Sequence, residues 1–306
     1  MPADTPNADR RGFLKCMTWA GTAMVWSVAG GIPRSGLVGA AEAAPTGFTF
    51  AQVSDSHLGF DKPVNTNVTG TFQESLTQAT SGTAPSFLIH TGDITHLSKP
   101  EQFDTAAQLL GATKLQVHTV PGEHDVLEDN GKSYLNHYGK GTQGDGWYSF
   151  NDHGVHFIAL VNVVNLQGNG LGDLGQPQLE WLEKDVKGLP SSMPIVVFAH
   201  VPLWIVAEDW GWGTKDGAQA LTYLKRFGSV TVLNGHIHQI MQKVEGHVAF
   251  HTARSTAFPQ GTPGVAKGPG PIPVPPGSLK TYLGTARVSL VNNTQPLAIV
   301  DTPLMG

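Results

Sequence analysis

Cysteine is almost absent from this chain. The sequence of 306 residues contains a single cysteine, Cys16. One thiol cannot form an intramolecular disulfide, and it cannot build a metal site from clustered thiolates. Any metal that the chain binds must therefore be held by imidazoles and carboxylates, and the sequence holds 13 His together with 24 Asp and Glu.

Positive charge and long apolar runs are also scarce. Lys and Arg total 19, the formal net charge is −5 at pH 7, and no basic stripe occurs. Nucleic-acid binding depends on such stripes, so the composition argues against a dedicated nucleic-acid partner. The weakly apolar stretch from Cys16 to Gly31 is broken by glycines. Because a bilayer span needs about 20 apolar residues, no stable membrane insertion is expected.

The first 43 residues are typical of an export signal. Asp9–Lys15 (DRRGFLK) resembles the twin-arginine motif, in which two adjacent arginines, here Arg10 and Arg11, precede Phe-Leu-Lys. Ala41–Ala43 then has the small-x-small pattern of a cleavage site. We expect residues 1–43 to form a signal peptide that engages the twin-arginine translocase, and the protein to be periplasmic or secreted. An uncleaved membrane anchor is the alternative.

The remaining residues, 44–306, alternate between strand-like and helix-like segments. Such alternation, with no internal repeat and no shift in composition, predicts one large α/β domain. The expected strands are 48–54, 86–91, 115–120, 147–151, 153–162, 194–199, 229–233, 246–252, 286–291 and 297–301, and the expected helices are 67–79, 100–110, 176–189 and 216–227. Residues 258–277 are so rich in proline and glycine that they are predicted to form a long loop.

Acidic residues and histidines gather where five of the apolar runs end. They form the clusters Asp55-Ser56-His57, Gly92-Asp93, Gly122-Glu123-His124-Asp125, His200 and Gly235-His236-Ile237-His238. Open α/β sheets place their sites at the carboxyl ends of strands, so the clusters should converge. If extension continues past the strand, both side chains of each Asp-x-His or His-x-His pair face the same way. Carboxylates and imidazoles bind divalent first-row metals, so the pattern indicates a site for more than one metal ion.

Taken in order, these clusters resemble the motifs of the calcineurin-like metallophosphoesterases. The family pattern is Asp-x-His, Gly-Asp, Gly-Asn-His-Asp or -Glu, a lone His, and Gly-His-x-His. The match extends from about Phe48 to His238. The resemblance implies a four-layer α/β/β/α sandwich that holds two metal ions, with Fe, Mn or Zn expected.

The resemblance also implies a role for each position. Asp55, His57 and His238 would bind the first metal. His200, His236 and Glu123 would bind the second, and Asp93 would bridge the two. His124 would stand beside the substrate as acid or charge stabiliser, and Asp125 would orient its imidazole. In this family a hydroxide held between the metals attacks phosphorus.

Glu123 departs from the family pattern, which has a neutral asparagine at this position. A third carboxylate in the metal centre should disfavour a dianionic monoester more than a monoanionic diester, so we expect a preference for phosphodiesters. The alternatives are that Glu123 turns away from the metals or that the site is degraded.

Several other residues are weighed as site residues. Arg254 is a candidate for a phosphate contact, and Trp204 is a candidate for part of an aromatic wall over the site. His90, His118 and His156 lie within strand-like runs and are expected to be structural. His96, His137, His153 and His247 lack spacing partners and are expected to lie on the surface or in loops.

We therefore expect an exported phosphoesterase with two metal ions and a small-molecule phosphoester substrate. One alternative is a hydrolase of a non-nucleotide organophosphate or of another ester at the same site. The other is a metal-binding protein of the cell envelope with little turnover.

Overall fold

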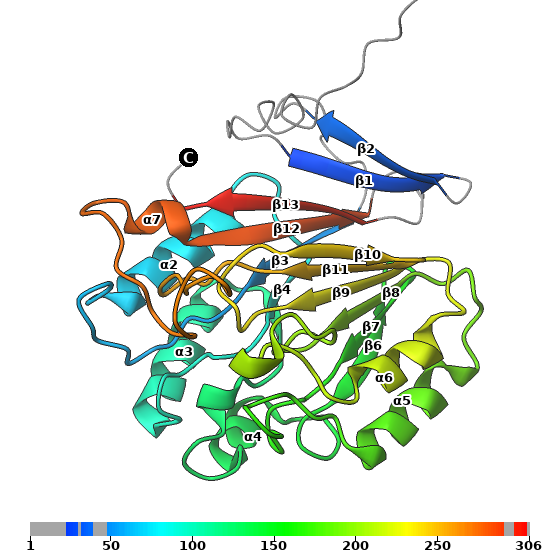
Figure 1. Cartoon of the computed structure of the whole chain (residues 1–306), viewed down its shortest axis with the longest axis horizontal. Helices are drawn as coiled ribbons and strands as arrows, with labels where there is room; N and C mark the ends of the chain where they lie inside the picture. Colours follow the sequence, from blue (N-terminus) through cyan, green and yellow to red (C-terminus); the bar gives the residue numbers. More distant parts are fainter. Residues whose placement is uncertain (1–22, 30–31, 39–47, 291–296, 305–306) are drawn as a thin grey trace, which may run out of the picture.

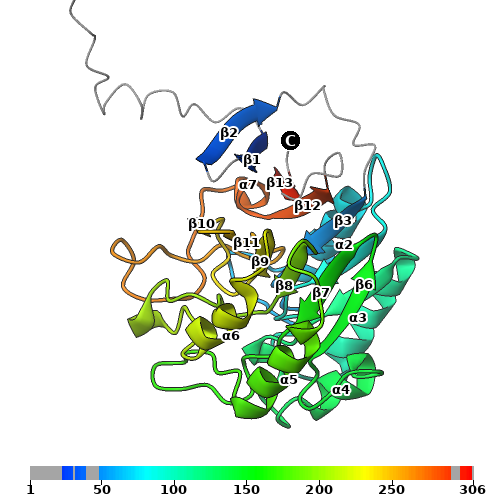
Figure 2. The same cartoon turned by 90° about the vertical axis from the view of Figure 1, so that its right-hand side faces the viewer.

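The computed structural model describes residues 23–29, 32–38, 48–290 and 297–304. Their strands form two large sheets and one hairpin. Helices cover the outer faces of the two large sheets, as Figures 1 and 2 show from perpendicular directions.

The first sheet has five strands in the order β13-β12-β3-β4-β5. Its strands are β3 (Thr49–Val53), β4 (Phe87–His90), β5 (Gln116–Thr119), β12 (Gly284–Leu290) and β13 (Leu297–Pro303). β3, β4 and β5 run parallel to one another, whereas β12 and β13 are antiparallel additions. The helices on this side are α2 (Val68–Ala79), α3 (Pro100–Ala112) and α4 (Lys132–Tyr138).

The second sheet has six strands in the order β10-β11-β9-β8-β7-β6. Its strands are β6 (Tyr148–Asp152), β7 (Val155–Ala159), β8 (Ile195–Phe198), β9 (Val230–Asn234), β10 (Gln242–Glu245) and β11 (Val248–Thr252). β7, β8, β9 and β11 are parallel. The helices on its outer face are α5 (Gln176–Lys187) and α6 (Gly217–Leu224).

Three buried clusters define the layers. One packs the two sheets against each other, with Phe50, Phe87 and Phe157 in contact. The second joins the first sheet to α2 and α3, and the third joins the second sheet to α5 and α6. The helix predicted for residues 176–189 is α5, and its buried side chains Leu179, Leu182 and Val186 belong to this third cluster. The predicted four-layer α/β/β/α sandwich is confirmed.

The structure adds elements that the sequence did not predict. β10 is a short edge strand whose four residues are all exposed, so no apolar pattern in the sequence predicts it. α4 follows the loop that contains Glu123 and His124, and a short helix α7 (Leu279–Tyr282) follows the proline-rich segment. Most of 258–277 lacks regular structure, as predicted.

The segments Ala23–Ala29 (β1) and Ile32–Val38 (β2) pair as an antiparallel hairpin beside β13 (Figure 1). They lie within the predicted signal peptide, which was expected to stand outside the fold. The twin-arginine motif and the cleavage site lie outside the described residues. Within the described part of the chain, no helix is both long and apolar enough to cross a membrane.

Candidate metal centre

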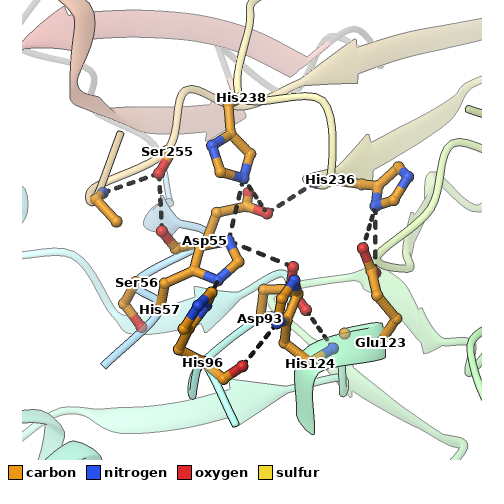
Figure 3. A network of polar contacts seen from close by, with 12 residues as sticks. Asp55, Ser56, His57, Asp93, His96, Glu123, His124, His236, His238 and Ser255 are labelled. Atoms are coloured by element: carbon orange, nitrogen blue, oxygen red, sulfur yellow. Dashed lines mark hydrogen bonds and ion pairs between the residues drawn. The ribbon is translucent and has the colours of Figure 1, made fainter. Parts of the chain in front are cut away.

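The seven predicted ligands come together where the carboxyl ends of the two parallel strand sets meet. Asp55 and His57 follow β3, Asp93 follows β4, and Glu123 follows β5. His200 follows β8, while His236 and His238 follow β9. Figure 3 shows six of these side chains directed toward a common centre. Both sheets therefore contribute to one site.

The first group of ligands is Asp55, His57 and His238. The Nε2 atom of His238 lies 3.3 Å from Oδ1 of Asp55 and 3.2 Å from Nε2 of His57. All three side chains are almost completely buried. Their ligand atoms lie within 4.8 Å of one another, which is compact enough for all three to coordinate one cation.

The second group is Glu123, His200 and His236. One carboxylate oxygen of Glu123 lies 2.9 Å from Nε2 of His200, and the other lies 3.0 Å from Nδ1 of His236. Glu123 does not turn away from the centre, so the structure contradicts that alternative. The carboxylate occupies the position that the family gives to asparagine.

Asp93 lies between the two groups. Its Oδ2 atom is 3.4 Å from Nε2 of His57 and 3.4 Å from Nε2 of His200. Its other oxygen accepts a hydrogen bond from the backbone N–H of His124 at 2.9 Å. One carboxylate is thus within reach of a cation in either group, as a bridging ligand must be.

The backbone at these ligands is not a continuation of the strands. Asp55, His57, Asp93, His236 and His238 all have positive φ, between 41° and 70°. The prediction that each pair faces one way through continued extension is therefore wrong in its mechanism. Left-handed backbone costs on the order of 1–2 kcal/mol for each non-glycine residue. Such strain concentrates at functional sites, where the surrounding fold maintains it.

Glycines allow the ligand loops to pack closely. A Cβ atom at Gly122 would collide with the backbone and carboxylate of Asp93, and one at Gly235 would collide with Ser54. Neither glycine has a positive φ. The glycine at these two positions is therefore needed for close approach of the ligand loops.

Backbone carbonyls fix the orientation of two ligand imidazoles. Nδ1 of His200 donates to the carbonyl of Thr91 at 2.7 Å, and Nδ1 of His238 donates to the carbonyl of Phe258 at 2.6 Å. Each ring consequently directs Nε2 to the centre. Metal-binding histidines in proteins are held in this way.

Three buried atoms of the ligand side chains make no well-aligned hydrogen bond with the described residues: Oδ2 of Asp55 and Nε2 of both His200 and His236. Buried polar atoms without partners are rare, and an ion is one of the few explanations for them. The donor set consists of carboxylates and imidazoles, which suits Fe, Mn or Zn. The residues therefore fit two metal ions.

The charges in the second group are strongly coupled. Burial alone would lower the pKa of His200, but the carboxylates of Asp93 and Glu123 outweigh it and raise that pKa well above its usual value. Burial alone would raise the pKa of Glu123, but His236 and His200 outweigh it and hold that pKa well below its usual value. The second group thus favours positive charge next to its carboxylates, and a cation held there would supply it.

His124 is placed to exchange a proton. Its Nδ1 donates to the carbonyl of His96 at 2.7 Å, and this bond orients the ring. Nε2 is therefore the ring nitrogen that can exchange a proton with a substrate. Burial alone would lower the pKa of His124, but Asp93, Glu123 and the bond to His96 outweigh it, so the pKa is raised. A ring nitrogen of His124 lies within 4.8 Å of ligand atoms of Asp93 and Glu123, and one lies equally close to those of His57 and His96, so the imidazole stands beside both ligand groups.

Asp125 does not orient His124, contrary to the prediction. Its two oxygens accept hydrogen bonds from the backbone N–H groups of Ile94, Thr95 and Gly122, at 2.7–3.0 Å. Burial, and then the charge of Asp93, raise the pKa of Asp125 to about 6, although these bonds lower it. Asp125 therefore fastens the loop that carries Asp93 to the loop that carries Glu123.

The two predicted substrate contacts are also engaged elsewhere. Arg254 donates to the carbonyl of Thr281 in α7 at 2.6 Å. The ring of Trp204 packs against Phe250, 4.9 Å between centroids, in the core beneath α5 and α6. These contacts lie outside the ligand groups, and the substrate contacts expected of both side chains stay predictions.

His96 lies in the loop after β4, as expected, but it also contacts the site, which was not expected. Its Nδ1 lies 3.4 Å from Nδ1 of His57, and its ring stacks on that of His124 with 4.8 Å between centroids. Burial, followed by the charge of His124, lowers the pKa of His96 to about 4. The sequence offered one signal, namely that His96 stands only three residues after Asp93. His90 and His156, by contrast, are structural as expected, with hydrogen bonds to Ser56 and Asp185.

A centre of this kind, with one carboxylate between two mixed carboxylate and imidazole groups on a four-layer sandwich, is that of a dinuclear metalloprotein. Residues 48–240 match the family model of the calcineurin-like phosphoesterases. The chain belongs to this family.

Two curated relatives are similar over about half of the chain. A 3′,5′-cyclic-nucleotide phosphodiesterase of Nostoc sp. is 25% identical over 173 residues, which cover 56% of this chain and 62% of the relative. The glycerophosphodiester phosphodiesterase GpdQ of Enterobacter lignolyticus is 26% identical over 163 residues, covering 51% and 57%. The chain thus spans about six-tenths of the length of these relatives.

Solved structures share the fold. A dimetal phosphatase from Danio rerio superposes with a TM-score of 0.65 at 16% identity, covering 85% of this chain and 97% of that one. A purple acid phosphatase from yellow lupin superposes with a TM-score of 0.57 at 12% identity, covering 85% and 54%.

Proposed function

We propose that this protein is a phosphoesterase that uses two metal ions to hydrolyse a small-molecule phosphoester, with a preference for diesters. The observation that carries the proposal is the position of Asp93. Its Oδ2 is equidistant, at 3.4 Å, from a ring nitrogen of each ligand group. Membership of the phosphoesterase family supports the same reaction class.

The metal ions, His124 and Asp125 would have different roles in this reaction. When bound, two cations would screen the charge of the phosphate oxygens and make water a nucleophile near neutral pH. Because Nδ1 of His124 is held by the carbonyl of His96, Nε2 is the atom that gives a proton to the leaving alkoxide. Asp125 keeps the loops of Asp93 and His124 at a fixed distance.

The preference for diesters rests on charge. With Glu123, three carboxylates instead of two surround the two cations, and the lower net positive charge weakens the attraction of a phosphate dianion more than that of a monoanion. Two relatives are named as phosphodiesterases of cyclic nucleotides and of glycerophosphodiesters, which supports the same preference.

Chromogenic substrates test this proposal. Protein loaded with Mn, Fe or Zn is assayed for kcat/KM with bis(4-nitrophenyl) phosphate and with 4-nitrophenyl phosphate. We expect the diester to be hydrolysed with the higher kcat/KM. His124→Ala should lower kcat by roughly 100- to 10,000-fold with unchanged metal content. His137→Ala, which removes a histidine of α4 outside the ligand groups, is the control.

Failure of the loaded protein to hydrolyse either substrate would favour the binding-protein alternative. A higher kcat/KM for the monoester would show that the inferred preference is wrong.

We also propose export to the periplasm or beyond by the twin-arginine translocase, on the basis of Arg10 and Arg11. Replacement of both by lysine should leave precursor in the cytoplasm. Undiminished periplasmic protein from this variant would refute this route.

A further inference from the structure

The ligand histidines differ in what holds their second ring nitrogen. His200 and His238 each donate Nδ1–H to a backbone carbonyl, at 2.7 and 2.6 Å. Among the described residues, no backbone carbonyl accepts from a ring nitrogen of His57. The partner of its Nδ1 is another imidazole nitrogen, Nδ1 of His96, at 3.4 Å. Figure 3 shows His96 on the side of His57 that faces away from His238.

With this contact, a metal bound to His57 would fix the proton positions on both rings. A histidine that binds a metal through Nε2 carries its proton on Nδ1. Nε2 of His57 faces Asp93 and His238, so its Nδ1–H is the donor to His96. Nδ1 of His96 must then accept, and the proton of His96 resides on Nε2.

The main chain of His96 makes a second contact with the centre. Its carbonyl accepts the Nδ1–H of His124 at 2.7 Å, and its ring lies parallel to that of His124 within 17°. The ring of Phe60 meets His96 edge-on, with 5.2 Å between centroids. His96 is thereby held against both His57 and His124.

We propose that His96 is a positioning residue whose Nδ1 accepts the Nδ1–H of His57, so that His57 presents Nε2 to the first metal. The same residue fixes the tautomer of His124 through its carbonyl. This inference rests on the proposed function only in requiring that the first ligand group binds a metal.

Three variants of His96 separate hydrogen bonding from packing. Asparagine places an amide oxygen near the position of the histidine Nδ1, so His96→Asn retains the acceptor and loses the ring. His96→Phe retains the ring and loses the acceptor, and His96→Ala loses both. Loss of an outer hydrogen bond to a metal ligand lowers metal affinity by about 10- to 100-fold.

The measurement is a titration of each full-length variant with Mn²⁺, followed by calorimetry, with kcat and KM determined at saturating Mn²⁺. We expect His96→Phe and His96→Ala to bind one of the two Mn²⁺ ions about 10- to 100-fold more weakly, and His96→Asn to bind it within a few-fold of wild type. His153→Phe makes the same substitution where an exposed histidine stacks on Phe48, and it should leave both affinities unchanged.

The opposite order, with His96→Phe unaffected and His96→Asn weakened, would show that the ring acts by packing and would overturn the proposal. Thermal unfolding of each variant identifies one that fails to fold. Hydrolysis is a separate readout: a wild-type protein that binds two Mn²⁺ ions but hydrolyses no phosphoester refutes the proposed function and leaves this inference intact.

Discussion

Glu123 gives the second ligand group a charge that the family asparagine lacks. Its carboxylate contacts both His200 and His236, so its effect is exerted directly on the second metal position. A third carboxylate should tighten the binding of a cation and weaken its action as a Lewis acid.

Replacement of Glu123 by asparagine should reverse both effects. One negative charge leaves the centre, so the second metal should bind less tightly and a phosphate dianion should be repelled less. We expect the ratio of kcat/KM for 4-nitrophenyl phosphate to that for bis(4-nitrophenyl) phosphate to rise in Glu123→Asn. This ratio cancels differences in active fraction between preparations.

Glu123→Gln is the matched control for side-chain length, because it removes the charge and keeps the chain of the glutamate. A rise in both variants assigns the effect to charge. Unchanged ratios and metal affinities in both would mean that the charge of Glu123 has no influence on the centre.

At the scale of residues, the sequence predicted which side chains converge but not all of their contacts. The ligands could be found because each follows an apolar strand at a fixed spacing. The hydrogen bonds of Asp125 and His96 could not be predicted, because both join the loop after β4 to the loop after β5. Spacing along the chain does not show which groups of two loops form hydrogen bonds with each other. The partners of Arg254 and Trp204, which are Thr281 and Phe250, also lie outside the motifs and could not be predicted from them.

At the scale of elements, apolar periodicity predicted the buried strands and the larger helices. β10 was not predicted because all four of its residues are exposed, and α4 was not predicted because it spans only seven residues. The positive φ of five ligands could not be predicted from the sequence either. A left-handed aspartate or histidine has no local signature, because the hydrogen bonds of the surrounding fold impose it.

β5 offers an element on which acid stability can be tested. Its His118 stacks on Phe150 with 3.8 Å between ring centroids. Burial lowers the pKa of His118 from 6.5 to about 4, although the charge of Asp152 raises it slightly. The neutral ring is favoured in the folded state, so its contribution to stability is complete above pH 6.5 and is lost as the pH falls from 6.5 to about 4.

His118→Phe should remove this loss while retaining the stacking. Between pH 7 and pH 5, the free energy of unfolding of the wild type should fall by about 2 kcal/mol more than that of the variant. Urea unfolding at both pH values measures the difference, and other titrating groups cancel in the comparison. Parallel pH profiles for the two proteins would contradict the assignment of His118 as a neutral buried base.

At the scale of the whole molecule, the sandwich brings two sheets together so that their parallel strands end at one place. The first sheet supplies Asp55, Asp93 and Glu123, and the second supplies His200 and His236. Neither sheet alone holds a complete pair of ligand groups. The alternation of strands and helices predicted an α/β domain, and the family resemblance predicted how the two sheets are layered.

The central claim is that Asp93 serves two metal ions, and metal content tests it most directly. Wild-type protein, Asp93→Ala and Asp185→Ala should be loaded with Mn²⁺, freed of excess ions and analysed by inductively coupled plasma mass spectrometry. Asp185 is the control because it also pairs with a histidine, His156, at 2.8 Å, outside the ligand groups.

We expect about two ions for each wild-type and Asp185→Ala chain, since both keep every ligand. Asp93→Ala should lose most of both ions, because a bridging carboxylate contributes charge and a ligand atom to each. Two ions retained by Asp93→Ala would contradict a shared carboxylate at the centre of this site.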